Sequence, residues 1–329
     1  MKAIQLDRFG GTDQFRVVEL PAPEPGPGQI RVRVHAAGVN FAETLMRENR
    51  YAMTPALPWL PGCEAAGTID ALGAGVTRLA VGQRVAAPLF AAGVFAGGYA
   101  SEVVIDAALA LPLPDGLGWD DAVALQVQGL TALALARHVP VAGRSALVSA
   151  AAGGVGGLLV QLLREAGAAT VTALAGGPAK CALATSLGAD AAIDYRAPDW
   201  IERVRAAAGG FGPDVIHDSV GGDFTPAALG LLAPRGNLVV YGALNIQRFA
   251  FGVPELLALI FRNQSVTGFA LAPLLTPERL HADWRELCAL HAQGRLRTVI
   301  GARLPLEQAG EAHRLLESRA STGKLVLHP

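Results

Sequence analysis

The segment from residue 146 to residue 180 constrains the fold of this chain more than any other. An apolar run at 146–150 is followed by small residues spaced Ala151-x-Gly153-x-x-Gly156, and then by apolar residues at three- and four-residue intervals. This pattern predicts a buried strand, a tight turn and an amphipathic helix. Small residues in such a turn let the backbone approach a pyrophosphate, and a helix N-terminus favours an anion. We therefore expect a dinucleotide-binding turn whose pyrophosphate contacts are Gly153, Gly154, Val155 and Gly156.

The next expected strand, at 170–175, indicates which dinucleotide is preferred. In NAD-binding units a carboxylate at the end of this strand accepts hydrogen bonds from the adenosine ribose. Here no Asp or Glu occurs between Ala166 and Ala189, and the strand is followed by Gly176 and, four residues later, Lys180. The pattern favours NADP(H), since a cation is available for a 2′-phosphate and no carboxylate repels it. The alternative is that Lys180 is a solvated helix residue and the glycines are only a loop.

Composition excludes several other classes of protein. The chain has 329 residues, which suits two domains, with 51% hydrophobic and 17% charged residues and a net charge of −1. No basic cluster attracts nucleic acid or an anionic membrane. No signal peptide and no convincing membrane-spanning run is present, so we expect a soluble, cytoplasmic protein. The cysteines Cys63, Cys181 and Cys288 are too scattered for a disulfide framework or a four-cysteine zinc site.

The pattern of elements changes along the chain. Residues 1–124 are rich in strand-like alternation and turn clusters, whereas strands and helices alternate between residues 145 and 243. Such alternation predicts a parallel sheet with helices on both faces, an α/β fold. We expect its strands near 145–150, 170–175, 191–195, 214–219, 237–242 and 265–271, and its helices at 154–166, 178–187, 199–208, 224–232 and 254–262.

Seven short motifs in a fixed order resemble one family. They are GlyValAsnPheAlaGluThrLeuMetArg (38–47), ProGlyCysGluAlaAlaGly (61–67), GlyGlyTyrAlaSerGlu (97–102), GlnGlyLeuThrAla (128–132), AlaAlaGlyGlyValGly (151–156), AspSerValGlyGly (218–222) and SerThrGlyLysLeuValLeu (321–327). Together they resemble the zinc-free, zeta-crystallin-like quinone oxidoreductase branch of the medium-chain dehydrogenase/reductase superfamily. The resemblance implies a GroES-like β-rich catalytic domain (1–124), a Rossmann NADP-binding domain (125–262), and a last stretch (263–329) that adds the final Rossmann strand and returns to the catalytic domain.

The superfamily's zinc alcohol dehydrogenases differ from this chain at their metal ligands. Asn40 stands where they carry a cysteine, Cys63 stands where they carry a histidine, and residues 126–128 contain neither Cys nor His. One soft ligand of three would not hold tetrahedral zinc. We expect no metal.

The resemblance also implies a set of cofactor contacts. Asn40, Phe41, Thr44 and Thr131 would line the nicotinamide, and Gly176, Lys180 and Tyr195 would meet the 2′-phosphate. Many relatives have serine near position 176, so Gly176 would weaken the preference for NADPH. Residues at the carboxyl ends of the later strands would complete the site: Ser219, Val220, Tyr241, Gly242, Ala243, Leu244, Phe269, Ala270 and Leu271.

Four candidate site residues have alternative roles. Asn40 could contact a ribose or an oxyanion, or only cap the helix expected at 42–47. Tyr51 could donate a proton after hydride transfer, or be a half-buried structural tyrosine. Tyr195 could reach the phosphate or adenine, or only pack at the end of its strand. Lys324 could approach the cofactor, or be a surface lysine. Our candidate catalytic residues are Asn40, Tyr51 and Thr131.

Three functions fit these features. The first is zinc-independent hydride transfer from NADPH to a quinone or another electron-poor carbonyl acceptor. The second is an NADPH-dependent ene-reductase for enones or enoyl thioesters. The third is an NADPH-binding structural or nucleic-acid-binding module, whose nucleic-acid form the near-neutral charge disfavours. By analogy with the family, the chain is expected to form a homodimer through edge strands of its nucleotide-binding domains, with a small-molecule substrate and no membrane partner.

Overall fold

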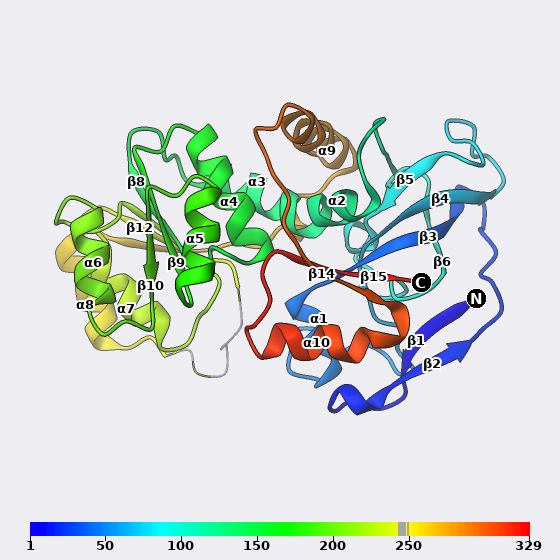
Figure 1. Ribbon diagram of the computed structural model, residues 1–329, viewed down its shortest axis with the longest axis horizontal. Helices are drawn as coiled ribbons and strands as arrows, with labels where there is room; N and C mark the ends of the chain where they lie inside the picture. The colour runs from blue at the N-terminus through cyan, green and yellow to red at the C-terminus, as the bar shows by residue number, and fades with distance from the viewer. Residues whose placement is uncertain (243–247, 249) are drawn as a thin grey trace. The chain divides into compact units, whose positions relative to one another are not determined.

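The computed structural model describes residues 1–242, 248 and 250–329, and these form two compact units (Figure 1). Unit 1 comprises Met1–Leu130, Ala272–Gln293 and Thr298–Pro329, and unit 2 comprises Thr131–Leu271 and Gly294–Arg297. Each unit has its own sheet and its own hydrophobic core. The fold is therefore a β-rich unit plus a parallel-sheet α/β unit, as the sequence predicts.

Unit 1 is built on a mixed sheet in the order β14-β15-β3-β4-β5-β7, with β6 paired to β3, and on the small sheet β1-β2. The long central strand β3 alternates buried and exposed side chains over most of its length, which is typical of a sheet with one face on the core. Its strands are β1 (Lys2–Leu6), β2 (Phe15–Glu19), β3 (Gln29–Val39), β4 (Ala65–Leu72), β5 (Arg84–Ala87), β6 (Glu102–Asp106), β7 (Leu111–Pro112), β14 (Ile300–Pro305) and β15 (Lys324–His328).

The C-terminal strand matters most for the site in unit 1. β15 pairs antiparallel with β3, with Leu325 opposite Val39 and Leu327 opposite Ala37. This pairing brings the end of the chain beside the loop that follows β3. The helices of this unit are α1 (Phe41–Arg47), α2 (Trp119–Ala124), α9 (Pro277–Ala292) and α10 (Ala309–Glu317), and a π-helical turn (Leu125–Gly129) follows α2.

Unit 2 contains a six-stranded, all-parallel sheet in the order β10-β9-β8-β11-β12-β13. Counted from its own first strand, this order is 3-2-1-4-5-6, the doubly wound arrangement of dinucleotide-binding folds. The strands are β8 (Ser145–Val148), β9 (Thr170–Ala175), β10 (Ala191–Asp194), β11 (Val215–Asp218), β12 (Asn237–Val240) and β13 (Ser265–Gly268).

The helices of unit 2 confirm the sequence periodicities. In α4, Leu158, Leu159, Leu162 and Leu163 are buried, as the three- and four-residue spacing requires. Every helix and strand expected in this region forms, with ends displaced by a few residues at most. The helices are α3 (Leu130–His138), α4 (Gly154–Glu165), α5 (Pro178–Ser186), α6 (Trp200–Ala207), α7 (Phe224–Leu231) and α8 (Val253–Arg262).

Candidate active site

The turn between β8 and α4 is as tight as the small-residue spacing predicts. A Cβ atom added to Gly156 would lie 2.4 Å from the carbonyl oxygen of Ala150, so only glycine allows this approach of helix and turn. Ala150 itself has a positive φ of 48°, and Gly153 is the N-cap of α4. Gly154 and Val155 begin the helix, and the first backbone N–H groups of a helix have no partner within it. The structure thus brings all four residues predicted to contact the pyrophosphate together at a helix N-terminus, where an anion is favoured.

The second turn that the sequence predicts to contact the nucleotide joins β9 to α5. A Cβ atom added to Gly176 would lie 2.9 Å from the hydroxyl oxygen of Tyr195, so the phenol occupies the place that a serine side chain would fill. Lys180 is half-buried in the first turn of α5. Burial lowers the pKa of its ammonium, and the nearby guanidinium of Arg196 lowers it further. Tyr195 therefore lies beside Gly176, and Arg196 lies near both Gly177 and Lys180.

Residues at the carboxyl ends of β11 and β12 also lie together. The Ser219 N–H donates a hydrogen bond of 2.9 Å to Ser149 Oγ, and a Cβ on Gly242 would lie 2.3 Å from the Ser219 carbonyl oxygen. Val220 N–H donates to Asp218 Oδ1 at 2.7 Å. The hydroxyl of Tyr241 is buried, which raises its pKa.

The remaining residues predicted for unit 2 lie at the two ends of its main chain segment, Thr131–Leu271. Phe269 follows β13 and packs edge-on against His138, with ring centroids 5.2 Å apart. Ala270 and Leu271 come directly after it, and Thr131 is half-buried near the start of α3. Ala243 and Leu244 lie outside the described residues.

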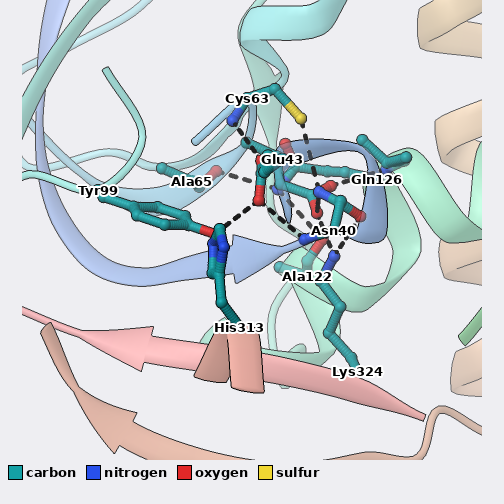
Figure 2. Close-up of polar contacts among 11 residues, drawn as sticks. Asn40, Glu43, Cys63, Ala65, Tyr99, Ala122, Gln126, His313 and Lys324 are labelled. Carbon is teal, nitrogen blue, oxygen red and sulfur yellow. Dashed lines mark hydrogen bonds and ion pairs between the residues drawn. The ribbon is translucent and has the colours of Figure 1, made fainter. Parts of the chain in front are cut away.

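Unit 1 holds a buried polar cluster around Asn40 (Figure 2). The Asn40 Nδ2 donates to Glu64 Oε1 at 2.8 Å and lies 3.5 Å from Cys63 Sγ. Its Oδ1 accepts a 2.8 Å hydrogen bond from Lys324 Nζ, and Lys324 also pairs with Glu64. The ammonium and carboxylate therefore fix which way the amide points. Both ends of the Asn40 amide are engaged inside unit 1.

The Lys324–Glu64 ion pair corrects one expectation. Lys324 has no exposed side-chain surface, so its assignment as a surface lysine is wrong. Pairing of β15 with β3 carries the residue into the interior, and Gly38 leaves room for it. A Cβ on Gly38 would lie 2.3 Å from Glu64 Oε1 and 2.7 Å from Lys324 Cε. An isolated buried ammonium would be very costly, and Glu64 supplies its counter-charge.

The π-helical turn Leu125–Gly129 provides a further hydrogen bond to Glu64. Its Val127 N–H donates a 2.8 Å hydrogen bond to Glu64 Oε2, and Gln126 Nε2 donates to the carbonyl of Ala65 at 3.0 Å. Widening of a helix to a π turn frees a backbone donor, and such turns are frequent at functional sites. Here the freed donor holds the buried carboxylate.

A second buried carboxylate, Glu43, lies beside the first. It sits three residues after the N-cap Asn40 and accepts the Asn40 N–H at 2.8 Å. It also accepts the Cys63 N–H at 3.1 Å and the Tyr99 hydroxyl at 2.6 Å. Burial raises the pKa of Glu43, and the hydrogen bonds from Tyr99 and Asn40 oppose that rise. Three donors stabilise the charged form of this carboxylate.

The hydrogen-bond chain continues from Tyr99 toward the surface. His313 Nε2 lies 3.1 Å from the Tyr99 hydroxyl, and Arg47 Nη1 lies 3.3 Å from His313 Nδ1. Since Tyr99 donates to Glu43 and arginine can only donate, His313 must accept at Nδ1 and donate from Nε2. Burial, reinforced by Arg47, lowers the pKa of His313 to about 3, so the ring is neutral. Arg47 is itself paired with Glu317 at 2.6 Å.

Other residues predicted for this unit are nearby. Phe41 is half-buried at the start of α1, and the Thr44 hydroxyl donates to the Phe41 carbonyl at 2.8 Å. Tyr51 packs partly against a cluster formed by Leu6, Met46 and Trp59, and burial raises its pKa. The sequence-predicted residues thus form two groups, Asn40, Phe41, Thr44, Tyr51 and Lys324 in unit 1 and the others in unit 2.

The residues at the expected metal-ligand positions do not suit zinc. Asn40 and Cys63 are in contact, as the ligand positions require, but burial raises the pKa of Cys63 well above that of a free thiol. Zinc binds the thiolate, and the neighbouring Lys324 ammonium would repel a dication. Across residues 1–242, 248 and 250–329, no group of three or more His, Cys, Asp or Glu side chains could hold a metal ion.

The structure also adds residues that the sequence patterns did not single out. Glu43, Tyr99 and His313 come from distant parts of the chain, and only the Asn-x-x-Glu spacing at 40–43 hints at a capped, buried carboxylate. Arg196 follows Tyr195 directly, and its importance becomes visible only when β10 is placed beside β9.

A β-rich unit joined to a doubly wound parallel-sheet unit defines the class of the protein as a two-domain dehydrogenase or reductase. Comparison with known families agrees, because residues 26–115 match the alcohol dehydrogenase GroES-like domain and residues 187–327 match a family described as zinc-binding dehydrogenase. The chain is 35% identical to a quinone oxidoreductase of Pseudomonas aeruginosa over 335 residues, covering 100% of this chain and 99% of the relative.

Two further relatives extend the comparison. A 2-haloacrylate reductase of Burkholderia is 33% identical, with 99% of this chain and 98% of the relative covered. The crystal structure of Escherichia coli quinone oxidoreductase complexed with NADPH superposes with a TM-score of 0.91 at 33% identity, covering 100% of both chains. The chain belongs to the quinone oxidoreductase branch of the medium-chain dehydrogenase/reductase superfamily.

Proposed function

We propose that the protein is an NADPH-dependent quinone oxidoreductase that transfers hydride to a quinone or another electron-poor acceptor without zinc. The observation that carries the proposal is the turn between β9 and α5. There the carboxylate typical of NAD-binding units is replaced by Gly176, with Lys180 and the Tyr195 hydroxyl beside it. The relatives named quinone oxidoreductase and the NADPH complex of one of them support the same assignment.

The residues of unit 2 fit the cofactor. The N-terminus of α4, from Gly153 to Gly156, would hold the pyrophosphate, and Gly176, Lys180 and Tyr195 would hold the 2′-phosphate. When bound, NADPH supplies the hydride. Residues around Asn40, Phe41, Thr44, Tyr51 and Thr131 would then orient the acceptor and exclude water, and a quinone takes up hydride and one proton to give the hydroquinone.

The charged cluster of unit 1 supports a reaction that needs no metal. Lys324 places its side-chain amine against Asn40 and Glu64, where a zinc-dependent relative would place its ion. Because Asn40 is engaged at both ends of its amide, we infer that it acts by fixing the loop after β3. Its direct role as a donor to substrate stays a prediction.

A relative named 2-haloacrylate reductase favours reduction of an activated C=C bond as the second candidate function. The two reactions place hydride on different atoms. Addition to an enone puts it on carbon, whereas hydride that reaches a quinone oxygen exchanges with water. The fate of a label carried by NADPH therefore distinguishes them.

The test uses [4-²H]NADPH, 1,2-naphthoquinone and a simple enone with purified protein in the presence of a chelator. We expect NADPH-dependent formation of hydroquinone without deuterium on carbon, with slower reaction from NADH. Deuterium retained on carbon of the enone product, with no quinone turnover, would replace the quinone assignment with the ene-reductase. If nucleotide binds and neither acceptor is reduced, both catalytic assignments fail.

We also propose a homodimer that pairs the nucleotide-binding units. Within the described residues, β13 is the terminal strand of the unit 2 sheet and pairs with β12 alone. The adjacent helix α8 buries no residue and exposes apolar side chains, among them Leu256, Ile260 and Phe261. An unpaired edge strand beside an exposed apolar helix is the surface that a second copy of the chain would cover.

A further inference from the structure

The turn after β9 contains Gly176 and Gly177, and the side chains of the two residues that follow β10 lie against it. The hydroxyl of Tyr195 is 2.9 Å from the position a Cβ would take on Gly176. The Nη2 of Arg196 is 2.1 Å from the corresponding position on Gly177. Gly177 also has a φ of 93°, in the region that favours glycine. A phenol and a guanidinium are thus held against the backbone that begins α5.

Arg196 is oriented by Asp194 at the end of β10. The guanidinium Nε lies 3.1 Å from Asp194 Oδ1 and Nη2 lies 3.2 Å from Oδ2, which makes a two-point fork. The backbone N–H of Arg196 also donates to Oδ1 at 3.0 Å. These hydrogen bonds from Arg196 lower the pKa of Asp194 to about 2, so the carboxylate is charged and its partner is fixed.

A second cation, Lys180, lies near Arg196 at this turn. Lys180 on α5 is close enough for Arg196 to lower its pKa, although burial is the larger cause. Two cations, Lys180 and Arg196, therefore lie near the N-terminus of a nine-residue helix. The guanidinium stays 58% exposed, so it is accessible from solvent, and the described part of the chain offers no hydrogen bond to its Nη1.

We propose that Arg196, aimed by Asp194, is the second cation that binds the 2′-phosphate and determines the preference for NADPH over NADH. The inference rests on the proposed function only in taking NADPH as the cofactor. A carboxylate without a counter-charge at this edge of the sheet would repel a phosphate dianion. The fork with Arg196 compensates the negative charge of Asp194. The carboxylate then orients the guanidinium that binds the phosphate.

This arrangement predicts a non-additive pair of substitutions. Arg196→Ala removes a cation and also leaves the Asp194 carboxylate uncompensated beside the phosphate. We expect it to weaken 2′-phosphate binding at least tenfold, as for loss of a charged hydrogen bond. Adding Asp194→Asn to Arg196→Ala removes the repulsion, so the double variant recovers part of the lost affinity.

The experiment measures binding of adenosine 2′,5′-bisphosphate and adenosine 5′-monophosphate to the full chain by titration calorimetry. These ligands differ only at the 2′ position and need no hydride acceptor. Arg196→Ala should lose affinity for the bisphosphate and keep that for the monophosphate, which also shows that the fold is intact. The matched control is Arg205→Ala, an exposed arginine on α6, which should change neither.

The outcomes separate this inference from the proposed function. If Arg196→Ala keeps the full discrimination between the two ligands, or the double variant binds the bisphosphate more weakly than Arg196→Ala, the inference is overturned. Discrimination that depends on Arg196 in a protein that reduces no quinone would support the inference and remove the proposed activity. A wild-type protein that does not discriminate at all would overturn the inference whatever its turnover.

Discussion

Lys324 carries its ammonium group into the interior of unit 1, where Glu64 and Asn40 replace the water that would otherwise bind it. Nothing in the residues next to Lys324 predicts this. Its burial depends on β15 pairing with a strand some three hundred positions earlier in the chain. By contrast, the positions of Gly153 and Gly156 could be predicted, because a tight turn between strand and helix is a local requirement.

We predict that Lys324→Met is destabilising because it leaves Glu64 charged, buried and without a counter-charge. The expected loss is about 3–5 kcal/mol in the free energy of unfolding. Adding Glu64→Gln removes the uncompensated charge, so the double variant should be more stable than Lys324→Met alone. Denaturant unfolding of the three proteins measures both effects.

Lys2 provides the matched control. Its 2.5 Å ion pair with Glu307 is on the surface, so Lys2→Met should cost no more than about 1 kcal/mol. If Lys324→Met cost as little as Lys2→Met, the buried pair would have no structural importance.

At the scale of elements, hydrophobic periodicity predicted the sheet and helices of unit 2 well. It did so because each parallel strand is an apolar run and each helix buries one stripe, and both patterns are local. The charged cluster of unit 1 is different. Glu43 comes from α1, Tyr99 from the loop before β6 and His313 from α10, so only the packed structure reveals that they form one hydrogen-bonded chain.

The close approach of α4 to the turn after β8 can be tested by substitution. Gly156→Ala places a methyl group 2.4 Å from the Ala150 carbonyl oxygen, so the turn has to move. We expect a loss of about 1–3 kcal/mol in stability and weaker nucleotide binding. Thermal unfolding and calorimetry measure the two.

The same substitution in another helix should have the opposite sign. Gly230 is exposed in α7, and a Cβ added there would meet nothing within 4 Å. Gly230→Ala should therefore stabilise the protein by about 0.5–1 kcal/mol. Equal destabilisation by both substitutions would contradict the close-approach explanation for Gly156.

Helix α10 introduces a pH dependence through His313. Its pKa is lowered from 6.5 to about 3 in the folded protein, because burial disfavours the charged ring. The unfolded chain therefore binds a proton that the folded chain does not, and the stability contributed by the neutral ring is lost as the pH falls from about 6.5 toward 3. It is fully present above 6.5.

His313→Gln should reduce this acid sensitivity. Between pH 7 and 5.5, the wild-type protein should lose about 1 kcal/mol more stability than the variant. Urea unfolding at the two pH values measures the difference. A variant with the same pH dependence as the wild type would show that His313 is not neutral in the folded protein.

At the scale of the whole molecule, the strand order of unit 2 and the seven sequence motifs led to the same family. Such motifs predict the family and the turns that it shares. They do not predict the exposed apolar face of α8. Leu256, Ile260 and Phe261 are apolar, yet within one copy of the chain they are exposed. The described residues include no helix that is both long and apolar enough to cross a membrane.

We predict that Phe261→Asp converts a dimer to a monomer. Light scattering after size-exclusion chromatography should give twice the 33.9 kDa chain mass for the wild type and the single-chain mass for the variant. Phe211→Asp is the control, because Phe211 is 79% exposed and Phe261 is 80% exposed. A wild-type protein that is monomeric, or an equal effect of both substitutions, would remove α8 and β13 as the interface.

Zinc-independent quinone reduction by NADPH is tested by measuring initial rates with 1,2-naphthoquinone. The protein is first treated exhaustively with a chelator, and the rate of NADPH oxidation is compared with the rate of NADH oxidation. We predict quinone-dependent oxidation that survives chelation, is faster with NADPH, and loses that preference in Lys180→Ala. Oxidation that disappears on chelation and returns with zinc, or equal rates with both nucleotides, would contradict this prediction.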